Sequence, residues 1–391
     1  MALLAGAVLA LSGFAPTAAW GQLYGRPVAQ PYFDFPTWAR FSDCRPMPLA
    51  WGYDPFPPYG SVDCASPSPV PIVACPGNFV AHRPSSWYAS ADFAPLKLDH
   101  QLDVEIARLG PDGPTVLDTG ELQREFDAGG QFTFGRRIFD CYRIEGTYIG
   151  LHDYEEAAIV TNNDLNAEGE IGDLSTLLSG FDDPIIPGLD SVSRVSIALD
   201  STFQSAEVNL RYWADMPPGP FDVSYLVGGR YIRIREQFNL ATESALPLPG
   251  GTLNDAQVNT ENDLVGLQIG IEGAFLISTR WWFDFDLKGG IYNNSTNQAT
   301  SFITTGGGEV LTGAEDETTA FVGDLSLVAN WQMTPNLQFR IGYQAIFIDG
   351  VALASENLAA NTDLLVSGPG RLNDQGEIAY HGPLIGLTWM R

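Results

Sequence analysis

Charged side chains occupy every second position in several otherwise apolar stretches of this chain. In the run 281–292, Asp284, Asp286 and Lys288 alternate with large apolar residues. Opposite charges that share one face of a sheet and are shielded from water need partners, because desolvation is costly. Such a face could be a structural ion-pair network or the lining of a charge-selective constriction. The residues of this set are Arg143, Glu145, Glu207, Arg211, Arg230, Glu272, Asp284, Asp286, Lys288, Asp324 and Arg340.

A weaker cation-binding pattern lies in the acidic segment 151–201. In "DLNAEGEIGDLS", Asp164, Asn166 and Glu168 precede a glycine as in the first half of a calcium-binding loop. The twelfth position is Ser175 instead of Glu, which excludes an EF-hand. The alternatives are a divalent-cation site, with Ca²⁺ as the candidate ion, and a solvated acidic surface. No other cofactor is expected.

Residues suited to hydrolysis are sparse. The chain has four histidines and contains neither G-x-S-x-G nor H-E-x-x-H. His152 and Asp153 are adjacent, and neighbouring residues on a strand point to opposite faces, so this pair cannot cooperate directly without a kink. We therefore predict that the protein is not an enzyme and that His152 is a solvent-exposed loop residue.

The four cysteines fall into two groups. Cys44, Cys64 and Cys75 lie in a proline-rich segment, and Cys141 lies far downstream. Their spacing matches no zinc site. In an exported protein we expect a disulfide between two of the first three, with the connectivity open. Cys141 is expected to be reduced and buried as a small hydrophobe.

Composition and the N-terminus limit the class of protein. The net charge of −27 excludes nucleic acid as a partner, since too few cations could neutralise phosphates. No run of about 20 apolar residues follows the N-terminus, so no transmembrane helix is expected. The first residues are typical of a secretory signal, with an apolar core and small residues at Ala19 and Gly21. The predicted parts are a signal peptide (1–21), a Pro- and aromatic-rich segment containing cysteines (22–85) and a strand-rich domain (86–391).

Hydrophobic periodicity places the charged residues on strands. In "LVGLQIGIEGAF" (264–275), Leu267 and Ile269 belong to an apolar face, whereas Gln268 belongs to a polar one. Most such runs are longer than ordinary globular strands and long enough for tilted membrane strands. The ten runs are about 87–96, 128–136, 141–150, 202–213, 221–236, 263–276, 281–292, 318–331, 337–347 and 380–391.

The connections between these runs alternate between short and long. The short ones are 137–140, 214–220, 277–280 and 332–336, and the long ones are 97–127, 151–201, 237–262, 293–317 and 348–379. Outer-membrane barrels place short turns in the periplasm and long loops outside. The predicted fold is therefore all-β: a transmembrane antiparallel up-and-down β-barrel of about ten strands (10–12), with long extracellular loops and a Pro-rich N-terminal extension.

Tryptophans gather near the strand ends that the loop pattern assigns to the periplasm. Interfacial aromatic girdles need amphipathic rings at headgroup depth. The expected girdle consists of Trp87, Trp213, Trp281, Trp331 and Trp389. This clustering favours lipid over a protein core against the apolar faces.

Several of these stretches resemble the beta-barrel porin-7 family of planctomycete proteomes. The resemblance rests on "FQSAEVNLR" (203–211), "YLVGGRYIRIREQF" (225–238), "IGYQAIFIDGVALASEN" (341–357) and "HGPLIGLTW" (381–389), and covers roughly residues 86 to 391. It implies an outer-membrane barrel and carries over no substrate or catalytic residue. The C-terminus "LTWMR" lacks the terminal aromatic usual for recognition by the barrel-assembly machinery, and Trp389 is the candidate substitute.

These observations lead to a first functional hypothesis and two alternatives. We expect an outer-membrane, porin-like barrel with a narrow or plugged lumen and a small, cation-preferring conductance. The alternative is a non-conducting surface barrel whose acidic loops bind divalent cations or other cell-surface components. The third is an outer-membrane hydrolase. The expected partners are outer-membrane lipid, the barrel-assembly machinery and divalent cations, and the oligomeric state is open.

Overall fold

A computed structural model describes residues 87–100, 103–122, 125–139, 141–164, 172–181, 189–214, 220–244, 252–303, 309–360 and 371–391. The predicted signal peptide (1–21) and the Pro-rich segment (22–85) lie outside the described residues.

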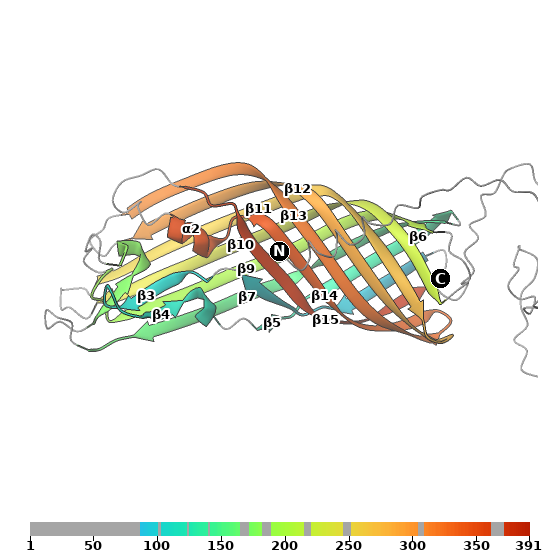
Figure 1. Ribbon diagram of the computed structural model, residues 1–391, viewed down its shortest axis with the longest axis horizontal. Coiled ribbons are helices and arrows are strands. Elements are labelled where there is room, and N and C mark those ends of the chain that lie inside the picture. The colour runs from blue at the N-terminus through green and yellow to red at the C-terminus, as the bar shows by residue number, and fades with distance from the viewer. Residues whose placement is uncertain are drawn as a thin grey trace, which may run out of the picture. The chain divides into compact units, whose positions relative to one another are not determined.

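Ten antiparallel strands close into a ring, because the first strand pairs with both the second and the last (Figure 1). The prediction of a ten-stranded up-and-down barrel is confirmed. In order around the ring, the strands are β1 (Trp87–Phe93), β6 (Gly130–Phe139), β7 (Tyr142–Thr161), β9 (Arg194–Trp213), β10 (Phe221–Ser244), β11 (Thr252–Leu276), β12 (Trp281–Ile303), β13 (Glu309–Thr334), β14 (Leu337–Val351) and β15 (Gly376–Met390).

Several shorter elements are not counted among these ten strands. β2 (Leu96–His100) continues the line of β1 beyond Pro95 and pairs with β15, and β5 (Phe126–Asp127) pairs with β2. A separate three-stranded sheet is formed by β3 (Glu105–Leu109), β4 (Thr115–Asp118) and β8 (Leu174–Thr176). Two 3₁₀ turns, η2 (Thr119–Glu121) and η3 (Leu177–Ser179), follow β4 and β8. Part of the predicted long loop 97–127 is therefore regular structure.

The strands β7 and β9 to β13 are much longer than predicted. They run for 20 to 26 residues, and the extra length lies on the side of the predicted long loops. The expectation of loops over 237–262 and 293–317 is wrong for most of these residues, which continue the wall of the barrel. We call this side the loop end. The opposite side, with the turns at 277–280 and 335–336, is the turn end.

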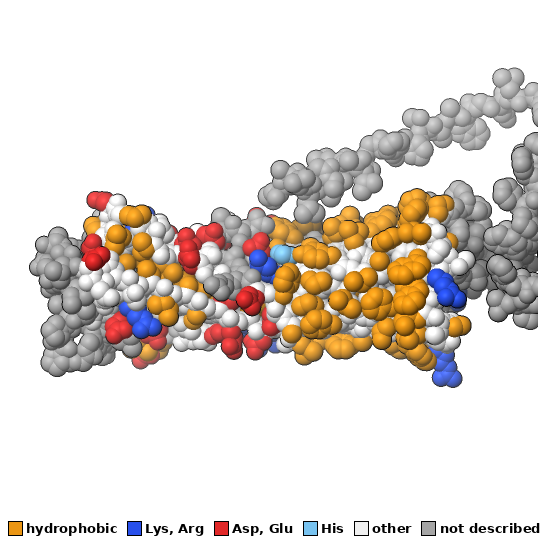
Figure 2. Space-filling view, turned by 90° about the horizontal axis from the view of Figure 1, so that it is seen from below, with side chains coloured by type: hydrophobic (Ala, Val, Ile, Leu, Met, Phe, Trp, Pro, Cys, Tyr) orange, Lys and Arg blue, Asp and Glu red, His pale blue; other side chains and the backbone are white. Residues whose placement is uncertain are grey.

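Exposed hydrophobic side chains form a band around the half of the barrel nearer the turn end (Figure 2). Leu267 is 74% exposed and Ile269 70% exposed, whereas Gln268 between them is 2% exposed. On β11 the band runs from Phe275 to Val265, about 33 Å along the strand at 3.3 Å per residue and about 25 Å along the axis of a tilted strand. This matches the apolar band of an outer-membrane barrel.

No helix among the described residues is long and apolar enough to cross a membrane.

The two faces exchange character toward the loop end. On β10, Tyr225 and Val227 point outward and Arg230 inward, but farther along Arg235 points outward while Phe238 and Leu240 are fully buried. The same exchange occurs on β9, where Leu199 and Phe203 are buried, whereas on β12 the inward residues Asn294, Thr296 and Gln298 stay polar. The half near the turn end is therefore built for lipid outside and polar groups inside, and the other half is built like a water-soluble barrel with an apolar core. This second core explains why the strands continue beyond the membrane.

A short helix fills part of the barrel at the loop end. α2 (Ala354–Ala360) follows β14 and lies against the inner face of β10 and β11, with its first five residues buried. Gly350, whose φ of 87° suits glycine, turns the chain at the end of β14. The side chain of Asn262 donates to the Ala352 carbonyl at 2.8 Å and accepts from the Ala352 amide at 2.8 Å. We call residues 350–358 the inner plug.

The closed ring predicts resistance to SDS. Without heating, the folded protein should migrate differently from a boiled sample, because the β1–β15 pairing leaves the ring with no free edge. The measurement is paired SDS gel electrophoresis of protein extracted from membranes with detergent. Identical mobility of the two samples, or recovery of the protein in the soluble fraction, would contradict a membrane barrel.

Candidate functional site

The eleven charged residues that the alternation assigns to one face all lie on the inner side of the barrel. Ten of them line a single cavity, and the eleventh, Arg230, has a fully buried side chain that contacts Asp324. They lie on seven neighbouring strands, β7 and β9 to β14, and Arg340 is the one that belongs to β14. Strand alternation therefore brings residues far apart in the sequence into one polar layer within the apolar band.

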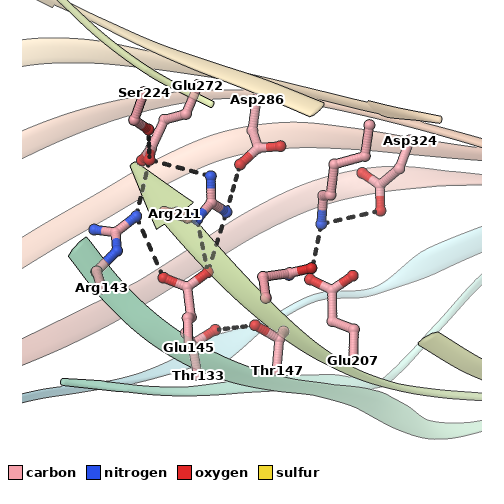
Figure 3. Close-up of polar contacts among 12 residues, drawn as sticks. Thr133, Arg143, Glu145, Thr147, Glu207, Arg211, Ser224, Glu272, Asp286 and Asp324 are labelled. Atoms are coloured by element: carbon pink, nitrogen blue, oxygen red, sulfur yellow. Dashed lines mark hydrogen bonds and ion pairs between the residues drawn. The ribbon is translucent and has the colours of Figure 1, made fainter. Parts of the chain in front are cut away.

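Arg211 is the centre of the first group, which we call the Arg211 cluster (Figure 3). Its guanidinium lies 3.1 Å from Glu145, 3.1 Å from Glu272 and 2.7 Å from Asp286. Arg143 completes the cluster, at 2.8 Å from Glu272 and 3.4 Å from Glu145. Three carboxylates thus share two guanidinium groups, which leaves a formal negative charge inside the barrel.

The second group, the Arg230 cluster, comprises Glu207, Arg230, Lys288 and Asp324. Arg230 lies 3.0 Å from Asp324, and the Lys288 ammonium lies 2.9 Å from Glu207 and 3.5 Å from Asp324. Each cation therefore touches a carboxylate from another strand. The Gln268 amide also donates to Glu207 at 2.8 Å. The cluster crosses the lumen from β9 to β13 and ties opposite walls together.

Two further carboxylates complete the layer. Arg340 lies 3.3 Å from Asp92 of β1, and Asp284 accepts from the Asn330 amide at 2.7 Å and from the Trp282 ring nitrogen at 3.3 Å. Sequence reasoning missed Asp92, although it sits at an inward position of the first run. It also missed Tyr88, whose hydroxyl donates to Glu145. The sequence could have indicated both, because each lies two positions from the buried Ser90 and therefore on the same face of the strand.

A cavity of about 180 Å³ lies among these groups and extends toward the turn end, where Trp213, Asp222 and Met390 line it. Beyond the charged layer, toward the loop end, the interior becomes apolar. Phe203, Phe238 and Tyr380 are each fully buried there. The lumen is thus occupied in series by ion pairs, an apolar core and the inner plug.

The aromatic girdle is only partly as predicted. Trp281 and Trp389 are about half exposed, and Trp281 stacks on Trp331 with ring centroids 5.7 Å apart. Trp87 is partly exposed and packs against Phe134. The prediction for Trp213 is wrong: it is 8% exposed and faces the lumen, with the Arg143 guanidinium 5.2 Å from its ring. Position 213 has the parity of Arg211, so strand alternation turns it inward.

The predicted exposure of His152 is also wrong. The residue lies in β7, is 3% exposed, and its Nε2 lies 2.9 Å from the Ala94 carbonyl oxygen. A bulge causes this: Leu151 has a φ of 71°, and the register shifts between Ile149 and His152. The bulge reverses the alternation, so His152 points inward while Asp153 is exposed. The two side chains do not meet.

The candidate calcium loop is described only at its two ends, and Ser175 at its twelfth position is buried in β8. Asp164 is exposed, whereas Asn166 and Glu168 lie outside the described residues. Within the ranges that the structure covers, no group of three or more His, Cys, Asp or Glu side chains could hold a metal ion.

Cys141 is buried as expected but is disulfide-bonded, so the prediction of a reduced thiol is wrong. The other cysteines, Cys44, Cys64 and Cys75, lie outside the described residues, as does the disulfide predicted among them. A lone cysteine far from the others in sequence gave no signal of this bond, because spacing does not report which cysteines meet in space.

Comparison with known proteins gives a family match over most of the chain. The family described as Putative beta barrel porin-7 (BBP7) matches residues 99–375. No curated protein sequence matches. Among solved structures, the chain is similar to the outer membrane protease OmpT from Escherichia coli, with 10% identity, a TM-score of 0.44 and coverage of 79% of this chain and 97% of that one. It is also similar to the translocator domain of the autotransporter NalP from Neisseria meningitidis, with 9% identity, a TM-score of 0.34 and coverage of 79% and 90%.

Proposed function

Because the chain belongs to the Putative beta barrel porin-7 family, we propose that it is an outer-membrane barrel that excludes bulk solutes and passes at most a small, cation-preferring current. The observation that carries this proposal is the filled lumen. The Arg211 and Arg230 clusters join opposite walls, and the apolar core and inner plug lie behind them. Ten strands enclose a narrow interior, whereas general porins with an aqueous channel have about sixteen.

The sign of the preferred ion follows from the charges along the path. The Arg211 cluster has three carboxylates against two cations, and the whole chain carries a net charge of −27. Acidic groups concentrate cations near a pore mouth, an effect that salt screens. Orientation follows the usual rule for such barrels, with the turn end in the periplasm and the loop end outside.

Single-channel recording in planar bilayers tests this proposal. We expect no steps or small, cation-preferring ones. If steps occur, Glu272→Gln should lower the cation preference, because it removes the surplus carboxylate from the Arg211 cluster. Glu261→Gln is the matched control, since Glu261 pairs with Arg235 on the outside of the barrel. A large, anion-selective conductance would contradict the proposal.

A second candidate is a non-conducting surface barrel that binds divalent cations. Five carboxylates, those of Glu261, Asp263, Glu315, Asp316 and Glu317, line a hollow of about 490 Å³ beside the loop-end edge of the apolar band, where they would attract cations as an acidic surface, because no three of these described side chains are placed to hold one metal ion. Arg233 and Arg235 pair with the first two. Calcium titration calorimetry distinguishes the candidates, because the first requires no calcium binding. We infer no hydrolytic role for His152, since Asp153 points away from it.

A further inference from the structure

An apolar groove runs over the lipid-facing side of four strands that meet where the ring closes. It is an open hollow of about 740 Å³, lined mainly by β1, β6, β7 and β15, with Leu337 of β14 and Glu207 of β9 also in its lining. Two cross-strand rows build it: Trp389, Ala89, Phe134 and Gly146 form one, and Leu387, Ala91, Phe132 and Tyr148 form the other. Small residues on β1 make the floor, and larger ones on both sides make the walls.

A positively charged side chain, that of Arg136, lies at the turn end of this groove. Arg136 of β6 is exposed and lies opposite Trp87, with its guanidinium 4.3 Å from the centre of the Trp87 ring. In the described ranges it has no carboxylate partner. This distinguishes it from Arg233, which lies at the other edge of the band and pairs with Asp263 at 2.7 Å. A desolvated groove with an unbalanced cation at one end is complementary to an amphiphile with an anionic head.

We propose that this groove binds one membrane phospholipid, with its phosphate on Arg136 and an acyl chain between β6 and β15. The groove lies within the apolar band, so its natural occupant is lipid, and the guanidinium is well suited to a phosphate. Trp87 and Trp389 flank the head at the depth where interfacial tryptophans lie. The proposal depends on the membrane placement but not on the closed lumen, so conductance does not bear on it.

Native mass spectrometry of the full chain tests the proposal. The protein is reconstituted with phosphatidylglycerol and phosphatidylcholine and then taken up in a mild detergent. We expect one phospholipid to be retained by the unaltered protein, with phosphatidylglycerol preferred. Ala91→Phe should abolish retention by filling the groove. The matched control is Ala329→Phe, which adds the same ring at an outward position of β13 between Phe283 and Ile341 and should keep the lipid.

Arg136→Gln tests the contribution of the lipid headgroup apart from that of the acyl chain. It should reduce retention of phosphatidylglycerol roughly tenfold, the scale of one lost charge-assisted hydrogen bond, and remove the preference over phosphatidylcholine. The mobility shift on heating in SDS confirms that each variant is folded. Equal retention in Ala91→Phe and Ala329→Phe overturns the proposal. A dimer that Ala91→Phe dissociates, with no bound lipid, also overturns it and assigns the groove to a second copy of the chain.

Discussion

Replacing Arg211 with alanine is expected to lower the free energy of unfolding by about 3–5 kcal/mol, the usual cost of breaking a buried ion pair. Arg211 contacts Glu145, Glu272 and Asp286, and its side chain is 5% exposed. Without it, Glu145 and Glu272 keep only their ion pairs with Arg143, and Asp286 loses its 2.7 Å contact. Equilibrium unfolding in lipid vesicles, followed by tryptophan fluorescence, measures the change.

Arg235→Ala provides the reference for an ion pair in water. Its side chain is 54% exposed and lies 2.8 Å from Glu261 on the outer surface, so its loss should cost less than about 1 kcal/mol. If both substitutions destabilise the protein equally, the lumen is well hydrated and the Arg211 cluster contributes little to stability. That result would also remove the main obstacle to ion flow through the layer.

Leu267→Arg should cost about 2–4 kcal/mol, because it places a cation near the middle of the membrane. Among the described residues, Leu267 is the most exposed large hydrophobic one, and it lies opposite Gly229 and Ile291 near the middle of the apolar band. The same unfolding assay in vesicles applies. A neutral outcome would mean that the band does not contact lipid.

The control variant also introduces an arginine on the outer surface, but at a position nearer the loop end of the barrel. Asn297→Arg is also outward-facing and exposed, but it lies toward the loop end between Glu261 and Glu315. It should be nearly neutral or slightly stabilising, because acidic groups surround it. Gln268 is a poorer reference, since its amide is engaged by Glu207 and Asn209 and replacing it would disturb the Arg230 cluster.

Strand number and facing could be predicted from the sequence because period-two alternation is a local property. The alternation along its own strand places Arg211 on the inward face, and this can be read without knowing which residues of other strands lie beside it. What could not be predicted depends on contacts between distant residues. The bulge at Leu151, which reverses the parity and buries His152, has no composition signal in a single sequence.

The loop-end extension was missed for a different reason. There the apolar residues move to the opposite face of the same strand, as from Val227 to Ile232 on β10, and the outward positions become polar. A search for one continuous lipid-facing pattern ends at that switch and takes the rest for loop. Trp213 illustrates the limit of residue type as a guide, because its position on the strand overrides the usual preference of tryptophan for the interface.

The length over which neighbouring strands pair differs around the ring. β10 and β11 pair from Phe221 to Ser244, whereas β1 and β15 pair only from Tyr88 to Phe93, with β2 adding a short stretch beyond Pro95. Backbone amides along this short seam should exchange with solvent deuterium sooner than those of the long strands. Mechanical or thermal opening should begin there, so the barrel should unzip sideways into the bilayer before its filled interior comes apart.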